Sequence, residues 1–254
     1  MIIARASESS HWYAKDGSPA YTVLAKNGEP RSTTLRDARK LGLLPSVTTI
    51  IKCAASPGLE AWKLNQMMLA ALTLPRAEGE SEQSFIARVQ ADSKEHARMA
   101  AERGTEVHAD IEGYFEGLAK EPSAYSLAVD KALDERFGDL DWSVEKSFAT
   151  PGPHGFGGKI DLHSTDGDGV VIDFKTKEFT SDTLDKAAGY EEHMMQLAAY
   201  RIGLGLPNAR AANVFVSVTE PGLVVVNEWS QDDLLRGWRM FEALKTYWYV
   251  KTQL

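Results

Sequence analysis

The residues best suited to chemistry lie in two neighbouring segments in the second half of the chain. Asp161 falls in the run FGGKIDLHS, while Asp173 and Lys175 fall in the later run VVIDFKT. Alternate side chains of a β-strand share a face, so an antiparallel hairpin of these runs places Asp161 beside Asp173, with Lys175 on the same face. Two adjacent carboxylates repel each other unless a proton or a cation neutralises them. The pattern therefore predicts a site for a hard divalent cation such as Mg²⁺.

A strand that contains Asp-x-Lys is a weak signal alone, because the triplet is most often a surface ion pair. Here it follows a Val-Val-Ile run that is expected to be buried, and Gly157 and Gly158 precede the partner carboxylate. Glycines at such a position would leave room for the backbone of a ligand. This context favours a functional site over a surface ion pair.

The ordered motifs of the chain resemble the PD-(D/E)XK nuclease superfamily. The likeness is to its RecB-like exonuclease branch, which includes the mitochondrial genome maintenance exonucleases and related phage and bacterial proteins. The segments GGKID, VVIDFKT and QLAAY carry the resemblance, together with GTEVH and LPSVTTII upstream and the later Trp62. It spans residues 44–204, and the specificity lies in the order of the motifs, since each one alone is weak.

The resemblance implies a restriction-endonuclease-like core and a deoxyribonuclease that depends on Mg²⁺ or Mn²⁺. It assigns His108, Asp161 and Asp173 as metal ligands, with the main-chain carbonyl of Phe174 as a further ligand. A lone helical histidine is usually structural, and only the GTEVH context favours His108 as a ligand. One or two metal ions are both compatible with these residues.

The resemblance also assigns three residues that do not hold the metal. Lys175 would orient the attacking water and stabilise charge on the phosphate. Gln196 and Tyr200 match the QxxxY motif, and their four-residue spacing places them on one helical face. There they would contact Lys175 or the DNA backbone, although the same helix must also pack on the sheet.

Three functions remain open at this point. The first is an exonuclease that acts on single-stranded or free DNA ends in recombination, repair or replication. The second is a structure-specific endonuclease of the same superfamily, and the third is a DNA-binding protein that keeps the fold without turnover. The intact set of charged and polar motif residues favours catalysis. No P-loop motif occurs, so unwinding would need a separate helicase, and a single-strand annealing protein is another expected partner.

The amino-terminal third contains a candidate DNA-binding region. Six basic residues against two acidic ones lie between Lys26 and Lys52, and this excess could line a positive groove or form an ordinary solvated surface. The residues selected as DNA contacts are Lys52, Trp62, Arg36 and Arg39. Trp62 could stack on bases in a strand-guiding arch of helices, but a tryptophan on an apolar helical face is more often core.

Three further residues near the motifs have two interpretations. Glu145 precedes the site on the first strand, where an acidic residue could support catalysis or form an ion pair at a strand edge. His154 and His163 flank the site in sequence only. We expect both to be structural or to face the substrate, not to bind metal.

The periodicity of the chain predicts a mixed α/β core with a mainly helical amino-terminal elaboration. Short strands and turns are expected in residues 1–45, including turns at Asp16-Gly17 and at Asn27-Gly28. The expected helices cover 56–67, 81–117, 185–204 and the stretch from 231 onward, and the expected strands cover 144–150, 156–164, 169–177, 213–220 and 223–230. The predicted domains are residues 1–95 for the elaboration, including the arch, and residues 96–254 for the nuclease core.

Composition sets the outer limits of these interpretations. With 254 residues, 43% of them apolar and 25% charged, the chain can bury a sizeable core. Its single cysteine, Cys53, excludes an iron-sulfur cluster held by four cysteines within the chain, so any metal must bind oxygen or imidazole. The net charge of −8 argues against passive coating of a polyanion. No eighteen-residue apolar run or signal-peptide layout appears, so a cytoplasmic protein without membrane contact is expected.

Overall fold

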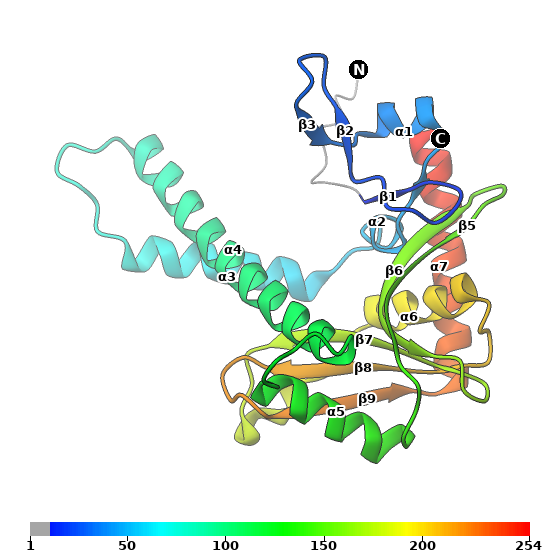
Figure 1. Ribbon diagram of the computed structural model, residues 1–254. Helices are drawn as coiled ribbons and strands as arrows, with labels where there is room; N and C mark the ends of the chain where they lie inside the picture. The colour runs from blue at the N-terminus through cyan, green and yellow to red at the C-terminus, as the bar shows by residue number, and fades with distance from the viewer. Residues whose placement is uncertain (1–10) are drawn as a thin grey trace. The chain divides into compact units, whose positions relative to one another are not determined.

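The computed structural model describes residues 11–254, without the side chains of residues 96 and 97. The chain divides into two compact units (Figure 1). The first contains the residues up to Cys53 together with Asp110–Leu254, and the second is Ala54–Ala109. The predicted boundary at residue 95 differs from this division, in which the amino-terminal elements share a unit with the carboxy-terminal part.

A five-stranded sheet forms the centre of the first unit. In spatial order its strands are β5 (Ser143–Thr150), β6 (Phe156–Ser164), β7 (Val170–Lys177), β8 (Arg210–Ser217) and β9 (Val224–Trp229). The β7–β8 pair is parallel and the other neighbouring pairs are antiparallel. This arrangement confirms the expected mixed sheet.

Helices cover both faces of the sheet. Helix α6 (Glu191–Leu204) contacts β5 to β8, whereas α5 (Ala124–Phe137) contacts β8 and β9. Gln196 of α6 donates to Asp173, which shares a face of the sheet with its partner Asn213 on β8. Arg136 of α5 forms an ion pair with Glu228 of β9. Asn213 lies opposite residue 227 of β9, the neighbour of Glu228, so the two helices lie on opposite faces. The result is a layered α/β core, which explains why β7 and β8 are buried on both sides.

The helices of the carboxy-terminal half are delimited by local signals. Gly205 ends α6 in the left-handed conformation, with φ of 73°. The hydroxyl of Ser230 accepts from the backbone N–H of Asp233 and starts α7 (Gln231–Thr252), which packs on α6. The predicted start of α6 at residue 185 is wrong, because a 3₁₀ segment, η1 (Ser181–Lys186), and a short connection come first.

The amino-terminal elements are short and pack on the sheet and its helices. They are β1 (Trp12–Tyr13), β2 (Thr22–Leu24), β3 (Pro30–Ser32), α1 (Leu35–Leu41), β4 (Leu44–Pro45) and α2 (Val47–Ile51). Helix α2 contacts α6, α7 and β6, and β1 and β4 also contact β6. Helix α1 lies in the region predicted to hold only strands and turns. A reciprocal cap between Thr34 and Asp37 starts it.

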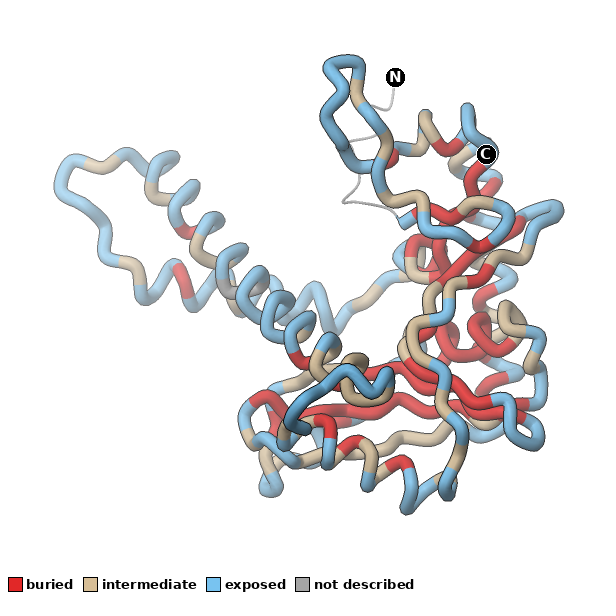
Figure 2. Tube along the Cα trace, in the orientation of Figure 1, coloured by how far each residue is buried: buried red, intermediate tan, exposed pale blue. Residues whose placement is uncertain are grey.

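The second unit consists of α3 (Pro57–Thr73) and most of α4 (Glu82–Phe115), whose last residues belong to the first unit. Exposed residues predominate along both helices (Figure 2). Trp62 is 41% exposed, so the interpretation of this residue as core is wrong. Although α3 exposes many apolar side chains, no helix within residues 11–254 is long and apolar enough to cross a membrane.

Gly157 and Gly158 make room for the protein's own aromatic side chains. A Cβ at Gly157 would lie 2.6 Å from the ring of Tyr13, and one at Gly158 would lie 2.7 Å from Phe148 and 2.8 Å from Tyr200. Such approaches are shorter than real Cβ contacts. The expectation that these glycines leave space for a ligand is therefore wrong, because packed rings already fill that space.

Candidate active site

Asp161 and Asp173 are brought together by the register of β6 and β7. The last antiparallel pair of these strands joins Leu162 to Ile172, so the next positions are the two carboxylates. One oxygen of Asp161, Oδ2, accepts a hydrogen bond of 2.8 Å from the backbone N–H of Phe174. The predicted pairing of the carboxylates thus follows from the hairpin, with a backbone contact that ties Asp161 to the neighbouring strand.

Asp173 is a buried carboxylate with three side-chain donors around it. Its exposed fraction is only 2%. Oδ1 accepts from Lys175 Nζ and from Gln196 Nε2, each at 2.8 Å, and Oδ2 accepts from Asn213 Nδ2 at 2.8 Å. Burial of a carboxylate is costly unless such partners compensate for lost water. These bonds fix the position and orientation of the group.

Gln196 and Tyr200 lie on the face of α6 that meets this carboxylate. Gln196 Nε2 also lies 2.9 Å from the Tyr200 hydroxyl, so the four-residue spacing has the predicted consequence. The contact of Gln196 is with Asp173, however, and not with Lys175. Burial, together with the negative charges of Asp173 and Asp161, raises the pKa of Tyr200 well above its ordinary value, so its hydroxyl remains neutral.

The surroundings of Asp161 raise the pKa of its carboxyl group to about 7. Burial is the largest cause of this rise, and the negative charge of Asp173 is the next. Lys175 and the Phe174 N–H oppose this rise. The lysine ammonium lies 2.6 Å from Oδ2 of Asp173 as well, so it neutralises chiefly that carboxylate. The ionised form of Asp161 is therefore poorly compensated by the protein, and a cation beside it would stabilise that form.

Two other residues predicted to bind metal keep that role as a prediction. The backbone N–H of Phe174 is placed by its bond to Asp161, while its carbonyl was the predicted ligand. His108 lies on α4 within the second unit. Among the side chains that the structure describes, no three or more His, Cys, Asp or Glu residues form a group that could hold a metal.

The residues of the amino-terminal third that were predicted to contact DNA are exposed. Lys52 ends α2, and Arg36 and Arg39 lie on α1. Arg39 donates to the carbonyl of Thr252 at the end of α7, so part of its bonding capacity is used within the protein. The DNA-binding roles of these residues and of Trp62 remain predictions.

Glu145 of β5 falls between two paired positions, at the level of Asp161 on β6. The neighbouring pairs Val144 with Leu162 and Lys146 with Ile160 set this register. Glu145 has a φ of 49°, a conformation that non-glycine residues seldom adopt, and its carboxylate forms an ion pair with Lys159. The ion-pair interpretation of Glu145 is thus confirmed, and it places this pair beside the site.

His163 and His154 have structural contacts. Nδ1 of the buried His163 lies 3.1 Å from the carbonyl of Ser143 on the adjacent strand. The ring of His154 stacks on Tyr249 at 4.7 Å between centroids. Both contacts fit the expected structural roles, and the expectation that neither histidine binds metal stays a prediction.

Asn213 and His193 were not selected from the sequence, yet both belong to the surroundings of the site. Asn213 is the parallel partner of Asp173 on β8 and is fully buried. His193 lies one turn before Gln196 on α6, and burial, followed by the charge of Lys175, lowers its pKa to about 4, while the charge of Asp173 opposes this change. Neither has a motif signal. The only hint for Asn213 is a polar residue within an apolar run, next to VFVSV.

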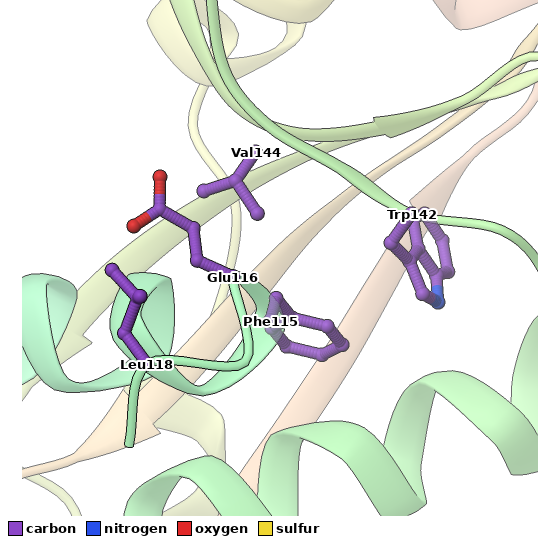
Figure 3. Close-up of a pocket in the computed structure, with 5 residues that line it drawn as sticks. All are labelled: Phe115, Glu116, Leu118, Trp142 and Val144. Atoms are coloured by element: carbon purple, nitrogen blue, oxygen red, sulfur yellow. The ribbon is translucent and has the colours of Figure 1, made fainter.

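A pocket of about 420 Å³ lies apart from the candidate site residues. It is lined by Phe115, Glu116, Leu118, Trp142 and Val144, from the end of α4 and the start of β5 (Figure 3). Val144 precedes Glu145, so strand alternation directs the two side chains to opposite faces of β5. None of the predicted catalytic or metal-binding residues lines this pocket.

Comparison with known proteins gives distant likenesses only. No family model and no curated protein matches the chain. Among solved structures, SSO0001 is similar with 15% identity and a TM-score of 0.32, over 73% of this chain and 86% of that one. A protein of Eubacterium rectale provisionally assigned as an exonuclease gives 12% identity and a TM-score of 0.36, over 57% and 68%. The alkaline exonuclease of Laribacter hongkongensis gives 15% and 0.34, over 76% and 98%.

Proposed function

We propose that this protein is a metal-dependent deoxyribonuclease that removes nucleotides from DNA ends. The observation that carries the proposal is the buried carboxylate of Asp173, held by Lys175, Gln196 and Asn213 with Asp161 beside it. A surface ion pair would not need a buried carboxylate with three side-chain donors. The order of the motifs is the reason for proposing phosphodiester hydrolysis as the reaction and DNA as the substrate.

The residues fit a hard divalent cation. Both acidic groups offer carboxylate oxygen, the ligand type that Mg²⁺ and Mn²⁺ prefer. The raised pKa of Asp161 shows that its charge is poorly compensated by the protein, and a cation at this place would remove the cost. We assign Asp161 and Asp173 as ligands, and the resemblance adds His108 and the Phe174 carbonyl.

The side chains of the site divide the remaining work. A bound Mg²⁺ or Mn²⁺ would supply a Lewis acid for water and for a phosphate oxygen. Gln196 and Asn213 hold the Asp173 carboxylate in one orientation, so its ligand geometry is set before substrate arrives. The Lys175 side chain is 26% exposed, and its ammonium can donate to the attacking water or to the phosphate as negative charge develops there.

The experiment compares cleavage of end-labelled single-stranded DNA, linear duplex and closed circular DNA, each with Mg²⁺, Mn²⁺ or a chelator. We expect metal-dependent loss of linear substrates and none of the circles. Asp173→Asn and Lys175→Met should each reduce this activity by at least roughly 10²-fold, because one weakens a ligand and the other removes the ammonium. Cleavage of closed circles would replace the exonuclease by an endonuclease.

Matched controls separate the site from general charge effects. Asp232→Asn on α7 and Lys131→Met on α5 change exposed residues of the same types and should leave cleavage intact. If no substrate is cut with either metal while the protein still binds DNA, the catalytic proposal is overturned. The non-catalytic DNA-binding function would then account for the fold.

A further inference from the structure

Tyr190 presents an aromatic ring at the surface where α6 begins. The residue is 53% exposed and precedes Glu191, the first residue of the helix. The ammonium of Lys177 lies over the ring, 4.3 Å from its centroid. His193, one turn along the helix, lies at 5.4 Å between ring centroids in a tilted arrangement. Lys177 and His193 thus cover part of the ring, and about half of the residue remains exposed.

Lys177, whose ammonium lies over the ring, makes several further contacts. Lys177 Nζ donates to the carbonyls of Ala188 at 2.8 Å and Lys186 at 3.3 Å, and it also lies 4.5 Å from the centroid of Phe215. Burial lowers the pKa of this lysine, as expected for an ammonium withdrawn from water. Its donors are directed to the chain that leads into α6. Tyr190 is therefore contacted by a half-buried ammonium that also binds the chain leading into α6.

Both supports of Tyr190 also carry the candidate active site. Lys177 follows Asp173 and Lys175 on the same face of β7, by strand alternation. Tyr190 precedes Gln196 by six residues on α6, which corresponds to about 9 Å along a helix axis at 1.5 Å per residue. An extended single strand advances by a comparable length over one to two nucleotides. The ring is thus within reach of a base close to a phosphate at Asp173.

We propose that the exposed part of the Tyr190 ring stacks on a nucleobase of the strand whose phosphate lies at the Asp161 and Asp173 site. The inference rests on the proposed nuclease function and names how that site holds its substrate. Every base has an aromatic face, so stacking on a fixed ring binds single-stranded DNA without regard to sequence. A ring that a cation contacts and that stays exposed to solvent suits this role.

The test compares Tyr190→Ser, Tyr190→Phe and the matched control Tyr247→Ser. Tyr247 on α7 is also 53% exposed and has Lys251 at 5.5 Å from its ring, but it lies outside the strands and helix of the site. Binding of a fluorescent single-stranded oligonucleotide is measured in chelator, and KM and kcat are measured with Mg²⁺. Tyr190→Ser should weaken binding roughly 5- to 100-fold and raise KM similarly, the range of base stacking on an aromatic ring.

Tyr190→Phe should retain binding, and Tyr247→Ser should match the wild type. An abasic nucleotide is placed at successive positions near the labelled end of the oligonucleotide. At one position it should weaken binding by the wild type but leave binding by Tyr190→Ser unchanged. Equal binding by wild type and Tyr190→Ser, with cleavage intact, overturns the inference and leaves the nuclease function standing. Absence of cleavage by the wild type on every substrate overturns the nuclease function first, and the inference with it.

Discussion

The indole Nε1 of Trp229 donates a hydrogen bond of 2.8 Å to Oδ1 of Asn213. This bond leaves the amide Nδ2 of Asn213 to face Oδ2 of Asp173, so a tryptophan on β9 determines which end of a buried amide meets the carboxylate. The three residues lie on three neighbouring strands. The orientation of Asp173 therefore depends on a side chain that does not touch it.

Trp229→Phe and Asn213→Ala should weaken the site in proportion to what each removes. Asn213→Ala deprives a buried carboxylate of a donor, and we expect a loss of about 1–3 kcal/mol in the free energy of unfolding. Trp229→Phe keeps an aromatic ring but removes the N–H donor, so the Asn213 amide can reverse. Its loss of stability should be smaller than that of Asn213→Ala. Denaturant unfolding measures stability, and Mn²⁺ titration measures metal affinity. A metal affinity unchanged in both variants would contradict the positioning role.

Lys175→Met should separate metal binding from cleavage. The variant removes the ammonium that now neutralises Asp173, so Mg²⁺ no longer competes with it, and the affinity for metal should equal or exceed that of the wild type. Cleavage should fall by roughly 10²–10³-fold, as when one electrostatic donor is lost. Calorimetric titration and single-turnover cleavage provide the two measurements. Loss of metal affinity in this variant would show that the lysine supports the ligands instead.

The free energy of unfolding of the metal-free protein should depend on pH because Asp161 titrates. Its pKa in the folded chain is raised to about 7 from an ordinary value of 3.8, so between these pH values the folded state holds a proton that the unfolded state releases. The contribution is fully present below about pH 4 and is lost as the pH rises to about 7. The pKa of His193 is lowered to about 4, mainly by burial, so its contribution to stability is present above pH 6.5 and is lost as the pH falls to about 4.

The diagnostic quantity is therefore the difference between wild type and Asp161→Asn. Relative to that variant, the free energy of unfolding of the metal-free wild type should decline between pH 4 and pH 7. Saturating Mg²⁺ should reduce the decline. Parallel pH curves for the two proteins without metal would contradict the raised pKa.

Gly158→Ala should destabilise the protein by about 1–3 kcal/mol, since its Cβ would meet Phe148 and Tyr200 at 2.7 and 2.8 Å. Displacement of Tyr200 should also reduce cleavage. Gly113→Ala on α4 is the control, because no atom lies within 4 Å of its Cβ and alanine favours helix. Thermal and denaturant unfolding of both variants test this packing, and a neutral Gly158→Ala would refute it.

His108→Ala tests the ligand that only the motif resemblance supplies. If His108 binds the metal, the variant should lose Mn²⁺ affinity while its melting temperature without metal stays close to that of the wild type. Glu106→Gln on the same helix is the control for a change in charge. Equal Mn²⁺ affinity in wild type and His108→Ala would leave the carboxylates as the ligands from side chains.

The sequence alone determined the parts of the site that depend on local rules. Strand alternation and the turn between residues 164 and 170 place Asp161, Asp173 and Lys175 on one face, and helical spacing places Gln196 and Tyr200 together. The mixed α/β class followed from the same periodicities. These signals are local because each depends only on residues a few positions apart.

Only the tertiary structure decided which distant residues complete the site. Asn213 meets Asp173 across a parallel pair whose partners lie 40 residues apart, and Trp229 joins through another pair. Likewise, Gly158 reads as open space in the sequence but faces the rings of Phe148 and Tyr200. The physical reason is that strand order and core packing bring together residues far apart in the chain, and no local periodicity records which ones will meet.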